Sequence, residues 1–395
     1  MVFADRLGEF HEQARNATGF DDFGSGHYLA PMRLYLEAID KGPRLSETGL
    51  AVTAGMMVSL LTGRLVTQKG LKQYPQSQDT PIKRPIFIIG LTRSGTTALH
   101  RLIACDPNVQ HLPYWLAEWP MPRPPRETWE SHPAYQRADA AFSAFAATMD
   151  QALLDIHPMA ADKADECLYL IDQTFCSNRF GATADVPDYQ NWWIHSDKCS
   201  AYEYYKKALA LIANGDSRRW ILKDPTHLFC LDAIFAVFPD ACVVQTHREP
   251  FDAMLSTANL MYLVRQMREP DLTPSETAQQ VVGLWSQGLE AMERARRRYN
   301  PAQFLDLHML EVKRDPIGCL ERIYDKFDVA IPAETRAAWE REITANPNQS
   351  HGRSLFDPRD FCLDKTGVAS AVGTYRERYQ AVCEAAEIRR DRDEV

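Results

Sequence analysis

The chain of 395 residues contains 45% apolar and 25% charged residues, which is the composition of a folded globular protein. Its net charge of −9 excludes a general role in coating nucleic acid or an anionic membrane, because those partners attract basic surfaces. An anionic ligand would therefore need a local basic pocket.

Helices are expected first along the chain. Apolar residues recur at helical spacing over 28–65, so residues 1–84 are predicted to form a helical N-terminal layer that ends in a polar linker, 67–84. The longest uncharged apolar run, 48–63, is shorter than the ~18 residues that mark a membrane-spanning helix. No membrane span is therefore expected, and peripheral membrane contact stays open.

A repeating order of strand and helix follows. Residues 85–90 form a short β-branched apolar run, typical of a buried strand, and a loop and a helix come directly after it. Alternating strands and helices predict a parallel sheet covered on both faces, so residues 85–395 are expected to form one α/β domain. The later elements of this order are predicted as strands at 219–223, 241–247 and 304–309, with helices at 227–238 and 251–267.

The remaining segments are predicted to be mainly helical. Residues 110–217 begin with many aromatic residues and become helical over 135–154, and we expect this insertion to cover the site. Further helices are predicted at 315–327, 333–343 and 371–389.

The cysteines and the N-terminal residues indicate the cellular compartment of the protein. The nine cysteines are scattered, and none forms the C-x-x-C pairs typical of zinc or redox sites. The N-terminus carries charges and lacks the apolar run of a secretory signal. We therefore expect a cytoplasmic protein with buried, reduced thiols.

The segment Gly90 to Thr97 fits the nucleotide-binding pattern G-x-x-x-x-G-K-[ST] except at the lysine, where Thr96 stands. In nucleotidases this lysine bridges the β- and γ-phosphates, so its loss removes the main cation of a triphosphate site. Backbone N–H groups at a helix N-terminus would still cradle an anion, and Arg93 adds donors within the loop. The loop thus favours an anion with fewer charges than Mg-ATP, and a simple tight turn is the alternative.

A second pair of polar residues follows a later strand. Arg248 comes directly after the strand at 241–247, and Ser256 follows in the next helix. The two side chains could face one phosphate, although a surface arginine at a helix start is the alternative reading of the same pattern.

Three motifs together are similar to one known family. RSGTT at 93–97, LKDPTHL at 222–228 and HREPFDAMLS at 247–256 resemble the PAPS-dependent sulfotransferase superfamily, particularly its bacterial branch and the tyrosylprotein sulfotransferases. The resemblance covers at least residues 85–265. It implies a P-loop-like three-layer α/β fold with a central parallel sheet, to which this chain would add the helical N-terminal layer and the helical insertion.

The resemblance also implies a donor and its binding residues. The donor is 3′-phosphoadenosine 5′-phosphosulfate (PAPS), the product is 3′-phosphoadenosine 5′-phosphate (PAP), and no metal is required. The first loop holds the 5′-phosphosulfate in such proteins, and an arginine and a serine eight residues apart hold the 3′-phosphate. The positions that match are Arg93, Ser94, Gly95, Thr96, Thr97, Arg248 and Ser256, with Arg353 and Ser354 as weaker candidates.

Catalytic groups are carried over in the same way. In the relatives a lysine in a K-D-P or K-S-P segment and the loop arginine lie near the transferring group, which points to Lys223 and Arg93. The base is a glutamate after the first helix in some relatives and a histidine in others. The positions most like that glutamate hold Pro113 and Tyr114 here.

Three residues compete for the role of base. Glu118 is the nearest acid after the first helix and is the first candidate, since the base must reach the acceptor side of the pocket. His227, four residues beyond the lysine, is the second, and His111 is the third. The acidic cluster of Asp162, Asp165 and Glu166 is interpreted as a solvated helix start.

The expected function is transfer of a sulfonate from PAPS to a hydroxyl of a small molecule. Aromatic residues between Tyr114 and Trp129, with Trp192 and Trp193, favour an apolar alcohol or phenol over a sugar or peptide hydroxyl. One alternative is a P-loop kinase or nucleotidase, which would need a magnesium ligand such as Asp224. Another is a nucleotide-binding module without catalysis. Homo-oligomer formation stays open.

Overall fold

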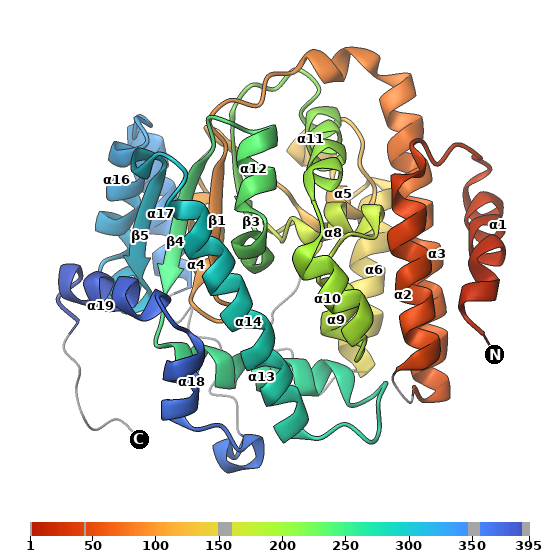
Figure 1. The fold of residues 1–395 in the computed structure, drawn as a ribbon. Helices are drawn as coiled ribbons and strands as arrows, with labels where there is room; N and C mark the ends of the chain where they lie inside the picture. Colours follow the sequence, from red (N-terminus) through yellow and green to blue (C-terminus); the bar gives the residue numbers. More distant parts are fainter. Residues whose placement is uncertain (1, 43–44, 149–159, 347–355, 389–395) are drawn as a thin grey trace.

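The computed structural model describes residues 2–42, 45–148, 160–346 and 356–388 of the chain. A five-stranded parallel sheet in the order β2-β3-β1-β4-β5 forms its centre. The helices lie around this sheet, with α16 and α17 at one side and α1 to α3 at the opposite side (Figure 1). The strands are β1 (Ile86–Gly90), β2 (Val109–His111), β3 (Arg219–Lys223), β4 (Cys242–His247) and β5 (Phe304–His308).

Four of these strands were predicted from apolar runs, within one residue at each end. Strand β2 was not predicted, because Val109–His111 is only three residues long and contains two polar side chains. It pairs with β3 at the edge of the sheet, where Gln110 Nε2 donates hydrogen bonds to the carbonyl oxygens of Asp216 and Arg218. Side-chain hydrogen bonds thus support a strand that lacks an apolar pattern.

Alternate residues of the strands enter two separate cores. Phe87 and Ile89 of β1 belong to the large core on one face, together with the N-terminal helices, whereas Ile86 and Ile88 belong to the smaller core on the other. Because successive side chains of a strand point to opposite faces, this division is that of a sheet between two helical layers. The three-layer α/β architecture expected from the sequence is confirmed.

The helices of the two layers have the following bounds. Those whose residues enter the smaller core are α4 (Thr96–Ile103), α16 (Pro316–Lys326) and α17 (Ala333–Ala345). Those whose residues enter the large core include α11 (Cys199–Ala213), α12 (Leu231–Val237), α13 (Pro250–Arg265), α14 (Pro274–Arg296), α18 (Lys365–Ala371) and α19 (Tyr375–Ala385). Helix α15 (Met309–Arg314) follows β5 directly.

The N-terminal layer consists of α1 (Leu7–Thr18), α2 (Leu29–Lys41) and α3 (Glu47–Gln73). The polar stretch 67–84 was predicted as a linker, but its first seven residues complete α3. The polar side chains there have buried partners: Thr67 Oγ1 lies 2.8 Å from Gln173 Oε1. Gly70 allows α11 to approach, since a Cβ on it would lie 2.7 Å from Leu211 Cδ2. Tertiary contacts therefore extend the helix beyond its apolar pattern.

Helix α3 is also long and apolar enough to cross a membrane, judged by length and composition alone. An 18-residue window within it has a mean hydropathy of 1.5. The uncharged run 48–63, from which no membrane span was expected, covers only part of this helix. Half of that window is buried inside the protein, and α3 packs on α1 and α11, as a core helix of a soluble protein would.

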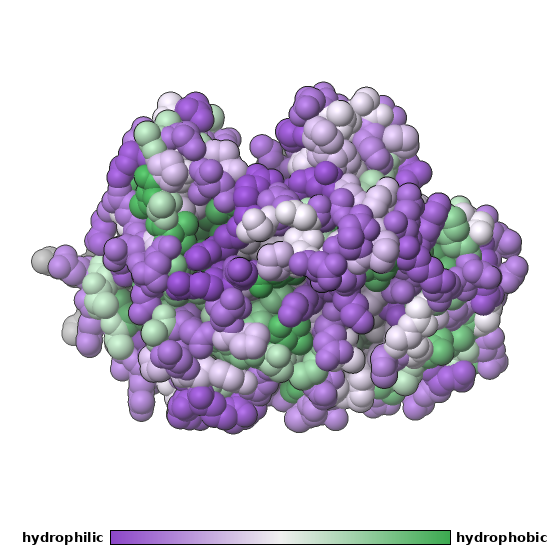
Figure 2. All heavy atoms as spheres, turned by 90° about the horizontal axis from the view of Figure 1, so that it is seen from above, coloured by the Kyte–Doolittle hydropathy of each residue, from purple (hydrophilic) through white to green (hydrophobic). Residues whose placement is uncertain are grey.

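The segment between β2 and β3 contributes α5 (Tyr114–Glu118), α6 (Pro133–Thr148), α8 (Leu168–Ile171), α9 (Arg179–Thr183) and α10 (Pro187–His195) as well as α11. In Figure 1 these helices lie between the sheet and α2 and α3. The view from above in Figure 2 shows a mainly hydrophilic surface with scattered apolar groups.

Candidate functional site

The loop between β1 and α4 is built around Ser94, whose side chain is fully buried. Its Oγ donates to the carbonyl oxygen of Leu91 at 2.6 Å and lies 2.7 Å from Thr246 Oγ1 on the neighbouring strand. Gly90 has φ +150°, and a Cβ there would lie 2.6 Å from the carbonyl oxygen of Thr246. The backbone thus turns tightly at the carboxyl end of the sheet, where parallel α/β proteins bind ligands.

The side chains predicted for the two phosphate groups lie together on one side of this loop. Arg93 has φ +71°, and its Nε donates to Ser256 Oγ at 3.3 Å. Arg248 Nη1 donates to the carbonyl oxygen of Arg93 at 3.0 Å. Burial lowers the pKa of both arginines, and the repulsion of Arg248 lowers that of Arg93 further. Two half-buried cations close enough to repel each other create a field suited to an anion.

Lys223 lies at the other side of the loop. It ends β3, its side chain is only 1% exposed, and its Nζ donates to Thr97 Oγ1 at 3.1 Å. The same Nζ lies 2.6 Å from Oε1 of Glu166. A carboxylate and an ammonium group therefore meet beside the phosphate-type loop.

Backbone contacts bring Glu166 to this position. The N–H of Cys167 donates to the carbonyl oxygen of Lys223 at 2.9 Å. Ala164 forms an antiparallel bridge with Pro113, directly after the segment that contains β2. The acidic cluster was interpreted as a solvated helix start. These backbone contacts instead hold its segment against the end of the sheet. Sequence reasoning missed Glu166 because no spacing along the chain relates it to the lysine.

Asp224 follows the lysine and is fully buried. Its Oδ1 accepts hydrogen bonds from the backbone N–H and the hydroxyl of Thr226, at 2.8 and 2.7 Å. Burial raises the pKa of Asp224 to about 7, and the nearby Glu166 carboxylate adds to the rise. Through its hydrogen bonds to Thr226, this carboxyl group caps the helical turn that begins at Pro225. Within the described ranges, no group of three or more His, Cys, Asp or Glu residues could hold a metal ion.

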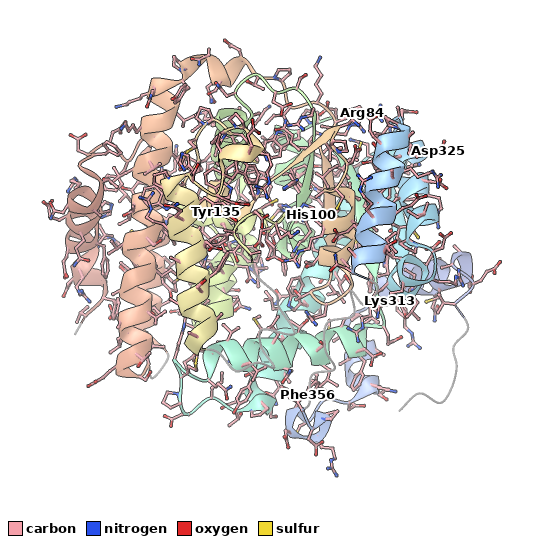
Figure 3. All side chains as sticks on the ribbon, turned by 180° about the vertical axis from the view of Figure 1, so that it is seen from behind. Arg84, His100, Tyr135, Lys313, Asp325 and Phe356 are labelled. Atoms are coloured by element: carbon pink, nitrogen blue, oxygen red, sulfur yellow. The ribbon has the colours of Figure 1, made fainter. Side chains whose placement is uncertain are left out.

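A cavity of about 1330 Å³ adjoins the loop. Its polar end is lined by loop residues 92–98, Glu166, Asp224 and Arg248. Lys313 and Phe356 also line it, from α15 and from the segment before α18, and both lie in the lower part of Figure 3. The described residues predicted for the donor thus surround one cavity, while Arg353 and Ser354 lie outside the described residues.

The three predicted bases do not line this cavity. Glu118 ends α5, accepts a hydrogen bond from Tyr114 OH at 3.0 Å, and has its pKa raised by burial. His227 is fully buried against Phe87, with Nδ1 2.5 Å from Tyr202 OH. Burial lowers the pKa of His227 to about 3, as it does for His111. The structure thus places the three predicted bases away from the cavity wall, whereas Glu166 lines the cavity.

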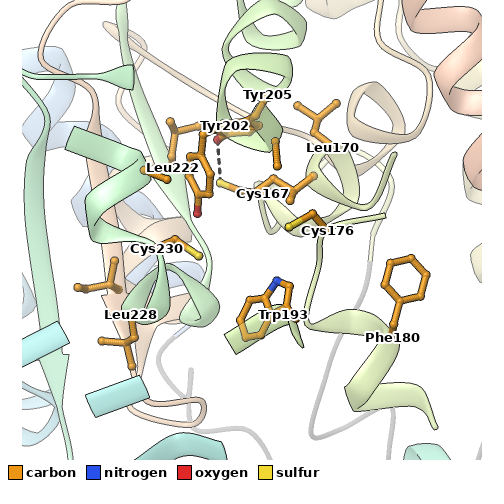
Figure 4. Close-up of a cluster of buried hydrophobic side chains, with 14 of the residues drawn as sticks. Cys167, Leu170, Cys176, Phe180, Trp193, Tyr202, Tyr205, Leu222, Leu228 and Cys230 are labelled. Atoms are coloured by element: carbon orange, nitrogen blue, oxygen red, sulfur yellow. Dashed lines mark hydrogen bonds between the residues drawn. The ribbon is translucent and has the colours of Figure 1, made fainter. Parts of the chain in front are cut away.

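The aromatic wall also differs from the expectation. Of the aromatic residues predicted to surround an acceptor, Tyr114 lines the cavity, whereas Trp115 and Trp129 are buried in the large core. Trp193 packs in the buried apolar cluster shown in Figure 4. Phe142 and Tyr169 of the insertion also line the cavity, and apolar residues of α13 and α14, which the sequence did not indicate, add to its wall.

Comparison with known proteins identifies this arrangement. A model of the sulfotransferase family matches residues 85–333, which is more than half of the chain. The chain belongs to the sulfotransferase family. The resemblance to the PAPS-dependent sulfotransferase superfamily, first indicated by three short motifs, is thereby confirmed.

Solved sulfotransferases share the fold over almost the whole chain. STF1 from Mycobacterium tuberculosis H37Rv is 35% identical, with a TM-score of 0.85 over 94% of this chain and 100% of that chain. STF9 from Mycobacterium avium is 23% identical, with a TM-score of 0.85 over 96% of this chain and 97% of that chain. The fold of these sulfotransferases therefore includes the N-terminal helices as well as the sheet.

A curated relative carries a more specific name. The omega-hydroxy-beta-dihydromenaquinone-9 sulfotransferase Stf3 of Mycobacterium bovis is 25% identical over 257 residues. The match spans 61% of this chain and 61% of the length of that relative.

Proposed function

We propose that this sulfotransferase-family chain is a cytoplasmic enzyme that transfers a sulfonate from PAPS to the hydroxyl of a small apolar alcohol or phenol. The observation that carries the proposal is the contact of Lys223 with both Glu166 and Thr97, which joins a carboxylate and a cation to the phosphate-type loop. A base and a cation on the same side of an anion-binding loop are what transfer of an anionic group to a hydroxyl requires.

The donor would lie across the loop. Backbone N–H groups at the start of α4, with the hydroxyls of Thr96 and Thr97, would hold the 5′-phosphosulfate. Arg248 and Ser256 would hold the 3′-phosphate, in agreement with the contact of both residues with Arg93. Close approach of the donor to the backbone is supported by Gly90 and Gly95, both with positive φ.

The chemistry would follow from these positions. Glu166 accepts the proton of the acceptor hydroxyl, and the oxygen attacks sulfur as the bond from sulfur to the phosphate oxygen of the donor breaks. Lys223 and Arg93 offset the negative charge that develops on the departing phosphate oxygen of PAP. The sulfonate ends on the acceptor as a sulfate ester, and the proton leaves from the carboxyl group.

An apolar acceptor is favoured by the wall of the cavity. Leu255 and Leu260 of α13 and Leu284 and Trp285 of α14 line it. Such a wall provides little hydrogen bonding for a sugar but favours burial of hydrocarbon. The name of the Mycobacterium bovis relative, which gives a hydroxylated menaquinone as its acceptor, points in the same direction.

Two measurements test the proposal. PAP is expected to raise the melting temperature of the protein, and radiolabelled PAPS is expected to label apolar alcohols or phenols. Stabilisation by Mg-ATP without stabilisation by PAP would overturn it in favour of a nucleotidase. Tight PAP binding with no transfer to any phenol, alcohol, sterol, glycolipid or peptide would favour a binding module without catalysis.

A further inference from the structure

One wall of the cavity carries an apolar stripe that begins on α13. Leu260 and Val264 of α13 and Met267 just beyond it all line the cavity. Leu260 and Val264 are four residues apart and so share one face of α13, and Met267 lies in the turn that follows the helix. Leu260, with partly buried neighbours that include Val264, forms a small cluster separate from the two cores on the faces of the sheet. The stripe therefore faces the cavity rather than the interior.

The stripe begins at the donor site and runs away from it. Ser256, which contacts Arg93, lies on the same helix. At a rise of about 1.5 Å per residue, the distance along α13 from Ser256 to its last residue, Arg265, is roughly 14 Å, and Met267 lies just beyond that end. Val281, Leu284 and Trp285 of α14 line the same cavity. An elongated apolar space thus starts beside the reacting groups.

The far end of this space is open and apolar. Val52 of α3 and Met267 line the cavity, and they are also 39% and 48% exposed to solvent. The start of α3 is fastened to the segment after α13, because the N–H of Ser46 donates to the carbonyl oxygen of Arg268 at 2.8 Å. We call the pair of Val52 and Met267 the lip.

The charge of Arg265, near the lip, is offset within the wall of the cavity. Arg265 lines the cavity, but its Nε donates to Glu269 at 2.8 Å and its Nη1 donates to Gln280 Oε1 at 2.6 Å. This arginine and Glu269 are both buried, so their charges offset each other within the wall. Arg268 also lines the cavity; its backbone carbonyl holds α3, and its half-buried guanidinium is a positive charge near the lip. Thr48 to Gly63 of α3 contains no charged residue.

We infer that the acceptor is a long-chain amphiphile, whose hydroxyl lies at Glu166 and whose hydrocarbon tail runs along α13 and leaves the protein at the lip. This inference rests on the proposed function and narrows its acceptor class. A short phenol would leave most of the stripe in contact with water, whereas a tail covers it. Each buried methylene group strengthens binding by up to about fourfold.

A series of primary alcohols tests the inference. With radiolabelled PAPS at saturation, kcat/KM is expected to rise from butanol to dodecanol and to level off when the tail passes the lip. In Val52→Asp and Met267→Asp, the ratio of kcat/KM for tetradecanol to that for butanol is expected to fall about tenfold or more, because a charge at the lip disfavours the tail. Leu29→Asp is the matched control, since Leu29 is 40% exposed and does not line the cavity.

A binding measurement separates this inference from the proposed function. Calorimetry on the PAP-bound protein is expected to show tetradecanol binding that both lip variants weaken and the Leu29 variant retains. Transfer or binding that is equal for butanol and tetradecanol, or equally impaired in all three variants, would overturn the inference and leave the proposed function standing. Tetradecanol binding without transfer to any acceptor would support the tail site and overturn the proposed function.

Discussion

Lys223 Nζ lies 2.6 Å from Glu166 Oε1, although 57 residues separate the two along the chain. The lysine is almost fully buried, whereas the side chain of the glutamate is 17% exposed and lines the cavity. The exposed face of this ion pair is therefore the carboxylate. A hydroxyl that enters the cavity meets a proton acceptor first and the cation behind it.

Replacement of Glu166 by Gln is expected to lower kcat by about 10²- to 10⁴-fold, because the amide cannot accept the proton of the acceptor hydroxyl. PAP binding should change little, since the substitution leaves Arg93, Arg248 and the loop in place. Single-turnover rates with saturating radiolabelled PAPS measure the effect.

The matched control is Glu118→Gln, which makes the same change at the glutamate that the sequence favoured as the base. Its side chain bonds to Tyr114 OH and does not line the cavity, so kcat is expected to stay within a few-fold of the wild-type value. The assignment of the base would be reversed by loss of turnover in the Glu118 variant alone.

Replacement of Arg248 by Ala is expected to weaken PAP binding by about ten- to a hundredfold, the effect of losing a charged hydrogen bond. Adenosine 5′-phosphate lacks the 3′-phosphate, so its weaker binding should be nearly the same in the wild-type protein and the variant. Calorimetry with both nucleotides measures this difference. An equal loss of affinity for both would place Arg248 away from the 3′-phosphate.

The contrast between these residues shows what the sequence could predict. Arg93 and Arg248 stand in short motifs just after strands β1 and β4, Ser256 follows in the next helix, and the carboxyl ends of parallel strands meet at one edge. Their neighbourhood could thus be derived from local pattern and topology. Glu166 could not, because it reaches the site through the bond from Cys167 to Lys223, a contact within an irregular segment.

The same distinction applies to the fold. Strands β1, β3, β4 and β5 are apolar runs bounded by turns, which a pattern can identify. Strand β2 and the last seven residues of α3 are polar, and partners far along the chain stabilise them. The apolar wall on α13 was hidden for a related reason: its residues have the spacing of any core helix, and only the packing shows that they face a cavity.

Replacement of Gly90 by Ala is expected to destabilise the protein by more than the ~1–3 kcal/mol that an unfavourable backbone conformation costs. The added Cβ would lie 2.6 Å from both the carbonyl oxygen and Oγ1 of Thr246, and 2.7 Å from Ser94 Oγ. Urea unfolding measures the loss. PAP affinity should fall as well, because the loop would have to move.

Gly215→Ala is the control for backbone conformation alone. Gly215 has φ +96°, and a Cβ there would meet no atom within 4 Å. The free energy of unfolding of this variant is expected to fall only by the cost of the positive φ, and its PAP affinity should equal that of the wild-type protein. Equal stability of the two variants would mean that the close packing of Gly90 against β4 adds nothing to the loss of stability in the Gly90 variant.

Stability is expected to fall as the pH is lowered from 7 to 5, partly because of His227. Burial lowers the pKa of this histidine from 6.5 to about 3, so over this range it stays neutral in the folded protein while it takes up a proton in the unfolded chain. The stabilisation is therefore complete above pH 6.5 and is lost progressively towards pH 3. Between pH 7 and 5 the loss from this residue is about 2 kcal/mol.

His227→Gln separates this contribution from those of other groups. Glutamine does not titrate, and its side chain can still bond to Tyr202 OH, so the variant should lose about 2 kcal/mol less than the wild-type protein between pH 7 and 5. Urea unfolding at the two pH values measures the difference. An unaltered pH dependence in the His227 variant would mean that this histidine can be protonated within the fold.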